Sequence, residues 1–155
     1  MTTIYLAADH AGFAHKEALK QHLLEAGQTV IDCGAYHVDS TDDYPDFIAP
    51  AAEAVRDAPA AARAIIFGGS GQGEAMVANA YPNVRATVYY GGPPDIITLS
   101  REHNDANVLS IGARFVSIAD TLDVVDQWLA TDFSSDERHV RRLQKRAALP
   151  PRLPI

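Results

Sequence analysis

Residues 64–80 read AIIFGGSGQGEAMVANA, and this stretch decides the fold class. The apolar run 64–67 is typical of a strand that is covered on both faces, as strands of parallel sheets are. The glycine-rich residues 68–73 predict a tight loop, and the Ala-, Met- and Val-rich residues from Glu74 onward predict a helix. A strand, a loop and a helix in direct succession indicate a βαβ unit, from which parallel sheets are built.

The same alternation continues in both directions along the chain. Further strands are expected at residues 3–8, 29–33, 84–90 and 108–111, and helices at 12–26, 45–57, 94–103, 117–130 and 135–147. The sequence therefore predicts a single three-layer, Rossmann-like α/β domain with a five-stranded parallel sheet and an extra C-terminal helix. We expect this domain to span residues 1–149, and the proline-rich residues 150–155 to form a C-terminal tail.

Composition excludes several classes of protein. The chain has 155 residues, of which 47% are hydrophobic and 21% charged, as in an ordinary folded domain. No apolar run approaches the roughly 20 residues of a membrane helix, and the first residues lack a signal-peptide pattern. Cys33 is the single cysteine, which fits a reducing compartment, so we expect a cytoplasmic protein without a membrane partner. The chain lacks CxxC, HExxH and EF-hand motifs, and we therefore expect no metal.

Charge is distributed unevenly along the chain. The net charge of −7 argues against a nucleic-acid partner. Residues 1–137 contain all 20 Asp and Glu, whereas residues 138–155 contain six Lys and Arg and no acid. Two interpretations stay open at this point. The last helix could simply offset an acidic body, or its cations, Arg138, His139, Arg141 and Arg142, could bind a small anion.

Candidate functional residues gather at one edge of the predicted sheet. In parallel sheets, ligands bind beyond the carboxyl ends of the strands. Residues 9–12, 68–73, 91–94 and 112–114 should meet there. The glycine loop leaves backbone N–H groups free to hold an anion. Glu74 interrupts a GxGxxG pattern and stands where a P-loop needs lysine, so a nucleotide-binding domain is disfavoured.

Glu74 itself has two interpretations. An acidic residue in the first turn of a helix stabilises the helix dipole by about 0.3–1 kcal/mol. Alternatively, the carboxylate is a general base that faces backbone N–H donors. Proton abstraction next to a carbonyl requires this combination, because the carboxylate takes the proton while the donors stabilise the enolate oxygen.

Several segments together resemble a known family. They are AADHAG (residues 7–12), TDDYP (41–45), GGSGQGE (68–74), SREHNDANVL (100–109) and Arg138-His139. In these segments, and over about residues 3–147, the chain resembles the ribose-5-phosphate isomerase B family, which includes galactose-6-phosphate isomerase subunits. The resemblance implies an aldose–ketose isomerase that works through a cis-enediolate without a metal or nucleotide cofactor. It also implies a homodimer, or a pair of dimers, with each active site at the subunit boundary.

The resemblance further implies roles for individual residues. Many members use a cysteine base just after the third strand, where this chain has Gly68, whereas one branch carries GGSGxGE and uses its glutamate, here Glu74. The expected catalytic residues are Glu74, Ser70, His103 and Asp9, of which His103 or Asp9 opens the sugar ring. The expected sugar-binding residues are Tyr44, Asn104 and the loop glycines Gly69, Gly71 and Gly73. The expected phosphate ligands are His10, Arg138, His139 and Arg142, with the C-terminal helix coming from the neighbouring subunit, and more weakly Arg114.

Taken alone, two of these residues also have plain structural interpretations. Asp9 could cap the helix that follows it, and His103 could be an exposed residue at a helix end. Histidine titrates near neutrality, which suits ring opening. The expected reaction is ribose 5-phosphate to ribulose 5-phosphate, a step of the pentose phosphate pathway. The alternatives are an isomerase for a four- or six-carbon aldose phosphate, or a non-catalytic sugar-phosphate sensor.

Overall fold

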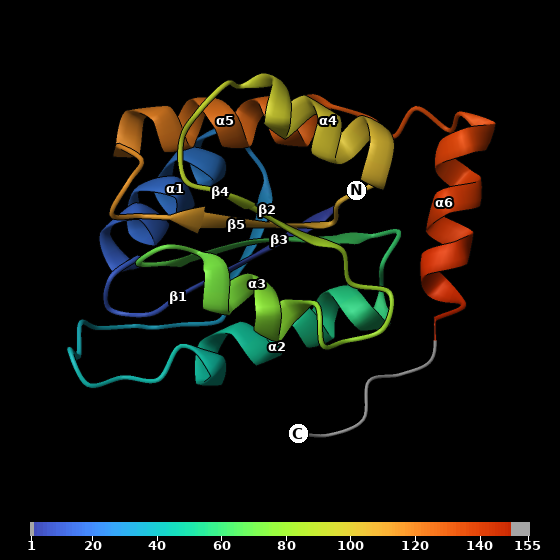
Figure 1. Cartoon of the computed structure of the whole chain (residues 1–155). Coiled ribbons are helices and arrows are strands. Elements are labelled where there is room, and N and C mark those ends of the chain that lie inside the picture. Colours follow the sequence, from blue (N-terminus) through green and yellow to red (C-terminus); the bar gives the residue numbers. More distant parts are fainter. Residues whose placement is uncertain (1, 150–155) are drawn as a thin grey trace.

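The computed structural model describes residues 2–149, and the predicted tail at 150–155 lies outside these residues. A parallel sheet with the strand order β2-β1-β3-β5-β4 lies between two layers of helices (Figure 1). The strands are β1 (Thr3–Ala8), β2 (Thr29–Asp32), β3 (Ala62–Gly68), β4 (Ala86–Tyr89) and β5 (Val108–Gly112). The helices are α1 (Phe13–Glu25), α2 (Pro45–Asp57), α3 (Gln72–Ala78), α4 (Asp95–Asn104), α5 (Ile118–Ala130) and α6 (Glu137–Ala147). The predicted fold class is thereby confirmed.

The central strands are apolar on both faces because both faces are covered. Successive side chains of a strand point to opposite faces. In β3, Ile65 and Phe67 belong to the core beneath α1, α4 and α5, whereas Ala64 and Ile66 belong to the core on the side of α2 and α3. The absence of an alternating pattern in residues 64–67 therefore reflects two cores that share one strand.

Several predicted boundaries shift by one or two residues, and two of these shifts lie in segments that the sequence analysis used. Helix α3 begins at Gln72, two residues before Glu74, which places the glutamate inside the first turn. Strand β4 begins at Ala86 and not at residue 84. The backbone N–H of Arg85 donates to the side-chain Oδ1 of Asn107 at 2.7 Å, and the register of β4 with β5 starts one residue later.

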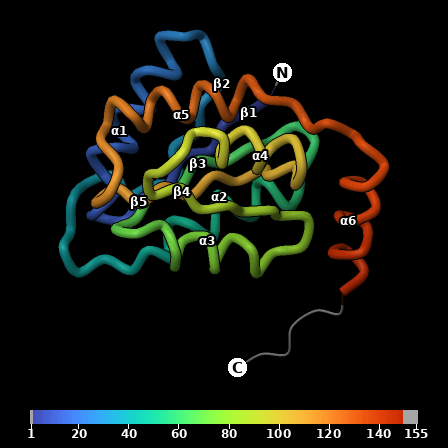
Figure 2. The backbone as a smooth tube through the Cα atoms, turned by 45° about the horizontal axis from the view of Figure 1, so that its top comes forward, coloured from blue at the N-terminus to red at the C-terminus, as the bar shows by residue number. Residues whose placement is uncertain are grey.

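The last helix stands apart from the sheet. Figures 1 and 2 both show α6 beside the end of the molecule opposite to the carboxyl ends of the strands. His139 is its buried residue, and most of its other side chains are exposed. Among residues 2–149, none of the helices combines the length and apolar character that crossing a bilayer requires.

Candidate active site

A cavity of about 330 Å³ lies at the carboxyl ends of β1 and β3. The chain connections reverse direction between these two strands, and α/β sheets bind ligands at such a switch point. The cavity is lined by Asp9, His10, Tyr44, Gly69, Ser70, Gly73, Glu74, Arg114 and Phe115. Three of the four segments predicted for this edge contribute to the lining, and residues 91–94 do not.

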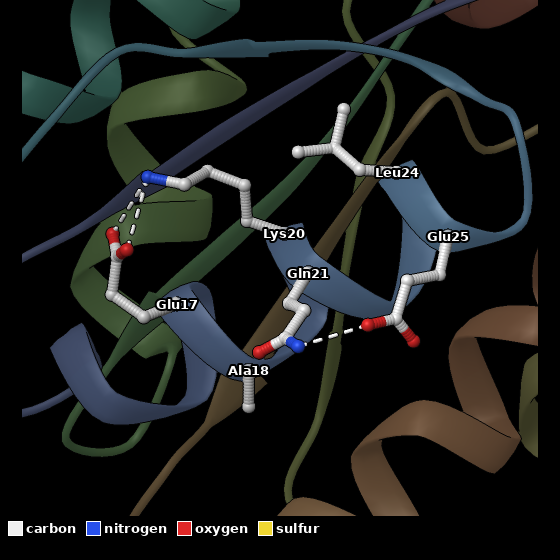
Figure 3. Close-up of a pocket in the computed structure, with 6 residues that line it drawn as sticks. All are labelled: Glu17, Ala18, Lys20, Gln21, Leu24 and Glu25. Atoms are coloured by element: carbon white, nitrogen blue, oxygen red, sulfur yellow. Dashed lines mark hydrogen bonds and ion pairs between the residues drawn. The ribbon is translucent and has the colours of Figure 1, made fainter.

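A second hollow lies on the outer face of α1 and differs in character (Figure 3). All of its lining residues come from this one helix, and their polar groups bind one another. Lys20 pairs with Glu17 at 3.0 Å, and Gln21 donates to Glu25 at 2.8 Å. The cavity at the switch point instead brings together side chains from several elements, and it is therefore the candidate active site.

Glu74 is a buried residue in the lining of this cavity. Only 4% of the residue is exposed, and its carboxyl group turns back against the end of β3. A Cβ atom at Gly68 would lie 1.8 Å from Glu74 Oε1, so only glycine at position 68 leaves room for the carboxylate. Burial raises the pKa of Glu74, and the charge of Asp9 raises it further, against a smaller lowering by its own backbone N–H. A carboxylate with a raised pKa is a stronger base.

The glycine loop presents backbone donors to the same cavity. The first N–H groups of α3 have no acceptor within the helix. Gly71 has a φ of 76°, a left-handed conformation that favours glycine, and its carbonyl accepts a 2.6 Å hydrogen bond from Ser110. A Cβ atom at Gly73 would lie 2.8 Å from the hydroxyl oxygen of Tyr44, so glycine here lets the tyrosine close over the loop. Ser70 is exposed beside these groups.

Asp9 and His10 stand at the end of β1. Asp9 Oδ1 accepts the backbone N–H groups of Ala11 and Gly12 at 2.9 and 3.1 Å, so it fixes the turn into α1. His10 Nδ1 lies 2.6 Å from Asp42 Oδ1, in the loop before α2. Ligand atoms of Asp9, His10 and Asp42 lie within 4.8 Å of one another, as in a metal site. A metal ion would compete with the hydrogen bonds that Asp9 Oδ1 and His10 Nδ1 already make.

Arg114 supplies a cation to the lining of the same cavity. Its guanidinium group lies over Gly69, where a Cβ atom would approach it to 3.2 Å. The side chain is exposed, and its charge lowers the pKa of His10, which places both groups in one electrostatic environment. An anion bound in this part of the cavity would contact both cations.

The remaining predicted residues form a second group elsewhere. His103 and Asn104 end α4, and Arg138, His139 and Arg142 lie on α6. The rings of His103 and His139 are 4.2 Å apart. Helix α4 follows the carboxyl end of β4 and runs toward the opposite end of the sheet (Figure 1), and the eight residues from its start to His103 span about 12 Å. In a single chain, therefore, His103 and Asn104 lie far from Asp9 and Glu74. Figure 1 shows α6, whose His139 contacts His103, at the end of the sheet opposite to the cavity.

Within this second group, His139 is the buried member. It is 1% exposed, and its Nδ1 lies 2.7 Å from the Ser134 hydroxyl. Burial lowers the pKa of His139, and the charges of His103 and Arg138 lower it further. The burial of His139 does not favour the direct phosphate contact implied by the resemblance. Arg138, by contrast, has a side chain that is 59% exposed.

The sequence did not point to three residues of the site. Gly68 makes room for Glu74, Asp42 binds His10, and Phe115 forms part of the wall. Asp42 lies within a segment that supported the resemblance, but nothing local connects it with a histidine 32 residues earlier. Phe115 directly follows Arg114 on the predicted edge, and this position was the one available signal.

Comparisons with known proteins identify the family of this chain. A family model described as Ribose/Galactose Isomerase matches residues 4–146. Ribose-5-phosphate isomerase B of Mycobacterium tuberculosis is 40% identical over 141 residues, which cover 90% of this chain and 85% of the relative. The Escherichia coli protein of the same name is 35% identical over 96% of this chain and 97% of its own length.

Solved structures extend the likeness to three dimensions. The crystal structure of ribose-5-phosphate isomerase B from Mycoplasma genitalium with bound ribulose-5-phosphate superposes with a TM-score of 0.90 at 33% identity, covering 94% of both chains. The Clostridium thermocellum enzyme gives a TM-score of 0.87 at 38% identity, covering 94% of this chain and 95% of that one. By sequence and by fold, this chain belongs to the ribose/galactose isomerase family that includes the ribose-5-phosphate isomerases B.

Proposed function

We propose that this protein interconverts ribose 5-phosphate and ribulose 5-phosphate, with Glu74 as the base. The observation that carries the proposal is the buried Glu74 carboxyl, which shares a cavity with Gly69, Ser70 and Gly73 of the glycine loop. The sugar phosphate bound to the Mycoplasma genitalium relative supports the same substrate class.

The proposed chemistry is a proton transfer between neighbouring carbons. Glu74 removes the proton from carbon 2 of the open-chain aldose, and the electron pair moves to give a cis-enediolate. Ser70 and the amides of Gly69, Gly71 and Gly73 stabilise the developing oxyanion, an effect typically worth about 2.7–4 kcal/mol for one donor. Glu74 then returns the proton to carbon 1 while the hydroxyl proton on oxygen 2 passes to oxygen 1, which leaves a hydroxyl at carbon 1 and the carbonyl at carbon 2. Tyr44 lines the sugar-binding part of the cavity.

We further propose that a second copy of the chain completes the site. His103 and Asn104 would come from that copy to open the ring and bind hydroxyls, with Asp9 assisting from this chain. Exposed apolar side chains, one of which is Phe115 of the cavity lining, support such an interface, since apolar groups left exposed in one chain are often covered by a second. These side chains are Met76, Tyr90, Ile96 and Phe115. The assembly would be a dimer or a pair of dimers.

The phosphate would lie between cations of both chains. His10 and Arg114 line the cavity of this chain. Arg138 and Arg142 lie four residues apart, so they share one face of α6 and could bind two phosphate oxygens each. His139 would support His103 from beneath. The proposed reaction needs no cofactor, and the single cysteine fits a cytoplasmic enzyme.

The proposal is tested with a panel of phosphorylated aldoses of four to six carbons. We expect turnover of ribose 5-phosphate that a chelator does not affect. Glu74→Gln should lower kcat by about 10²- to 10⁴-fold while phosphate ligands still bind, because only the base is lost. Glu53→Gln is the matched control, since Glu53 is exposed on α2.

Three outcomes would contradict the proposal in whole or in part. Normal turnover by Glu74→Gln would remove this residue from its role. Binding of sugar phosphates without exchange of the carbon-2 hydrogen with solvent would indicate a sensor. Preferential turnover of a four- or six-carbon sugar would keep the mechanism but change the substrate.

A further inference from the structure

Asp42 has no role in the chemistry described so far, yet it makes one of the shortest polar contacts of the cavity. Its Oδ1 lies 2.6 Å from His10 Nδ1 and also accepts the backbone N–H of His10 at 3.3 Å. The Asp42 side chain is only 7% exposed, although it lies in a polar loop. The neighbouring Asp39 folds this loop by accepting both the N–H and the hydroxyl of Thr41.

This contact determines how His10 can meet a ligand. An imidazole whose Nδ1 donates to a carboxylate keeps its Nε2 for other partners, and the carboxylate fixes the ring orientation. His10 lines the cavity, so the free edge of its ring is available to a bound substrate. Without Asp42, the ring could rotate, and either nitrogen could carry the proton.

The contact also determines the charge of His10. The hydrogen bond to Asp42 raises the pKa of His10, and Asp9 raises it further, whereas desolvation and Arg114 lower it by less. Asp39 lies within electrostatic range of the ring as well. Asp42 Oδ2 is buried and has no hydrogen-bond partner among residues 2–149, and both contacts of Oδ1 described above come from His10. The carboxylate therefore acts mainly on His10.

We propose that Asp42 is a positioning residue that orients the His10 ring and holds it in the cationic form, with Nε2–H presented to the phosphate of the substrate. This inference deepens the proposed function and rests on it for the identity of the substrate. It assigns Asp42 no direct contact with the sugar.

The first test needs no turnover. The titration of His10 is followed by NMR in the native protein, in Asp42→Asn and in Asp43→Asn, whose side chain is exposed next to Asp42. We expect the pKa of His10 to fall toward about 6.5 in Asp42→Asn and to stay raised in Asp43→Asn. An unchanged pKa of His10 in Asp42→Asn would overturn the proposal.

Binding of inorganic phosphate, measured by calorimetry, gives the consequence for a ligand. At pH 7.5 we expect Asp42→Asn to bind phosphate roughly tenfold more weakly, as loss of a charged hydrogen-bond donor predicts. Below pH 6, His10 is protonated in both proteins, so the two affinities should converge. A loss of affinity that is the same at all pH values would indicate a purely structural role and would contradict the proposal.

Kinetics and a second background complete the test. With ribose 5-phosphate, Asp42→Asn should raise KM by a similar factor at pH 7.5 and leave kcat nearly unchanged. In a His10→Gln background, Asp42→Asn should add almost nothing to KM, and an equal further loss would count against action through His10.

If Asp42→Asn does not fold, Asp42→Glu keeps the charge and should keep the raised pKa of His10. If the native protein does not isomerise ribose 5-phosphate, the proposed function fails. The NMR and phosphate-binding measurements would still test whether Asp42 orients His10 and holds it in the cationic form.

Discussion

At the scale of single residues, Gly68 and Glu74 share one space. The carboxyl group of Glu74 occupies the position that any larger side chain at residue 68 would need. The resemblance to the family places a cysteine base at this position in many members. The two forms of the site are therefore mutually exclusive, because one chain has room for the cysteine side chain or for the carboxylate. The glycine at residue 68 is therefore required for the Glu74 carboxyl to occupy its position.

Gly68→Ala tests this relation. The added methyl group should displace the Glu74 carboxyl from the cavity, and a displacement of about 1 Å can cost roughly 10²-fold in rate. We expect kcat for ribose 5-phosphate to fall by about that factor, measured together with thermal unfolding to show that the fold is kept. In the Glu74→Gln background the same substitution should cost little more. Full activity of Gly68→Ala would show that the carboxyl position does not matter.

At the scale of elements, a buried ion-pair network joins α1 to β2. Lys16 is fully buried, and its Nζ lies 2.7 Å from Asp32 Oδ2 and 2.7 Å from Glu17 Oε1. Lys20 binds the same Asp32 oxygen at 2.7 Å. The loop that leaves β2 at this point carries Asp42 and Tyr44 to the cavity. The network therefore anchors the start of a segment on which the site depends.

Asp32→Asn should destabilise the fold by about 3 kcal/mol at pH 7, because it leaves the buried Lys16 with a single, half-exposed acidic partner. Burial raises the pKa of Asp32, but hydrogen bonds from Lys16, Lys20 and the Gly34 amide lower it by more. Its stabilisation is therefore complete above the unfolded-state pKa of about 3.8 and is lost as pH falls through the lower folded-state pKa.

Urea unfolding at several pH values checks this prediction. The difference between the native protein and Asp32→Asn should be large at neutral pH and should shrink below pH 3. Asp57→Asn is the control, since Asp57 pairs with Arg56 on the surface, where such pairs contribute about 0–1 kcal/mol. Equal effects of both substitutions would show that the network around Lys16 is not a special contribution to stability.

Features of this structure that depend on neighbouring residues could be predicted from the sequence, whereas contacts between segments far apart in the chain could not. The strands and helices follow from local patterns, so residues 3–8 and 45–57 were predicted with the bounds that the structure shows. Asp9 and Glu74 were placed at the carboxyl edge of the sheet because each directly follows a strand or opens a helix, whereas the expected role of Asp9 in ring opening came from the resemblance. The contact between His10 and Asp42 depends on packing between segments 32 residues apart, and no local pattern encodes it. Likewise, the position of His103 follows from the direction of α4 relative to the sheet.

At the scale of the whole molecule, the residues assigned to the proposed function fall into two groups at opposite ends. The cavity contains Glu74, the proposed base, and the proposed oxyanion donors, whereas the end of α4 contains His103 and helix α6 contains Arg138 and Arg142. The charge of the sequence is uneven as well. The acidic residues lie in residues 1–137, and the basic segment after them includes most of α6. An acidic body with one exposed basic helix disfavours polyanions, yet it can hold a single phosphate when two chains combine.

A mixed dimer tests whether two chains combine in this way. Glu74→Gln and His103→Ala should each inactivate both sites of their own homodimer. In a heterodimer of the two variants, isolated with two different affinity tags, one site carries both substitutions and the other carries neither. We therefore expect the heterodimer to recover about half of the native activity, as two-fold symmetry requires.

A second heterodimer makes this result specific. Glu74→Gln and Gly68→Ala affect the same group of residues, so each site of their heterodimer keeps one defect and no activity should return. Recovery in both heterodimers would contradict the shared site, because exchange of subunits can only re-form the impaired parent homodimers. If the first heterodimer were as inactive as its parents, His103 would have to reach Glu74 within one chain. The path of α4 away from the cavity excludes that arrangement in the structure described here, because the helix would have to leave the sheet on which Ile97 is buried.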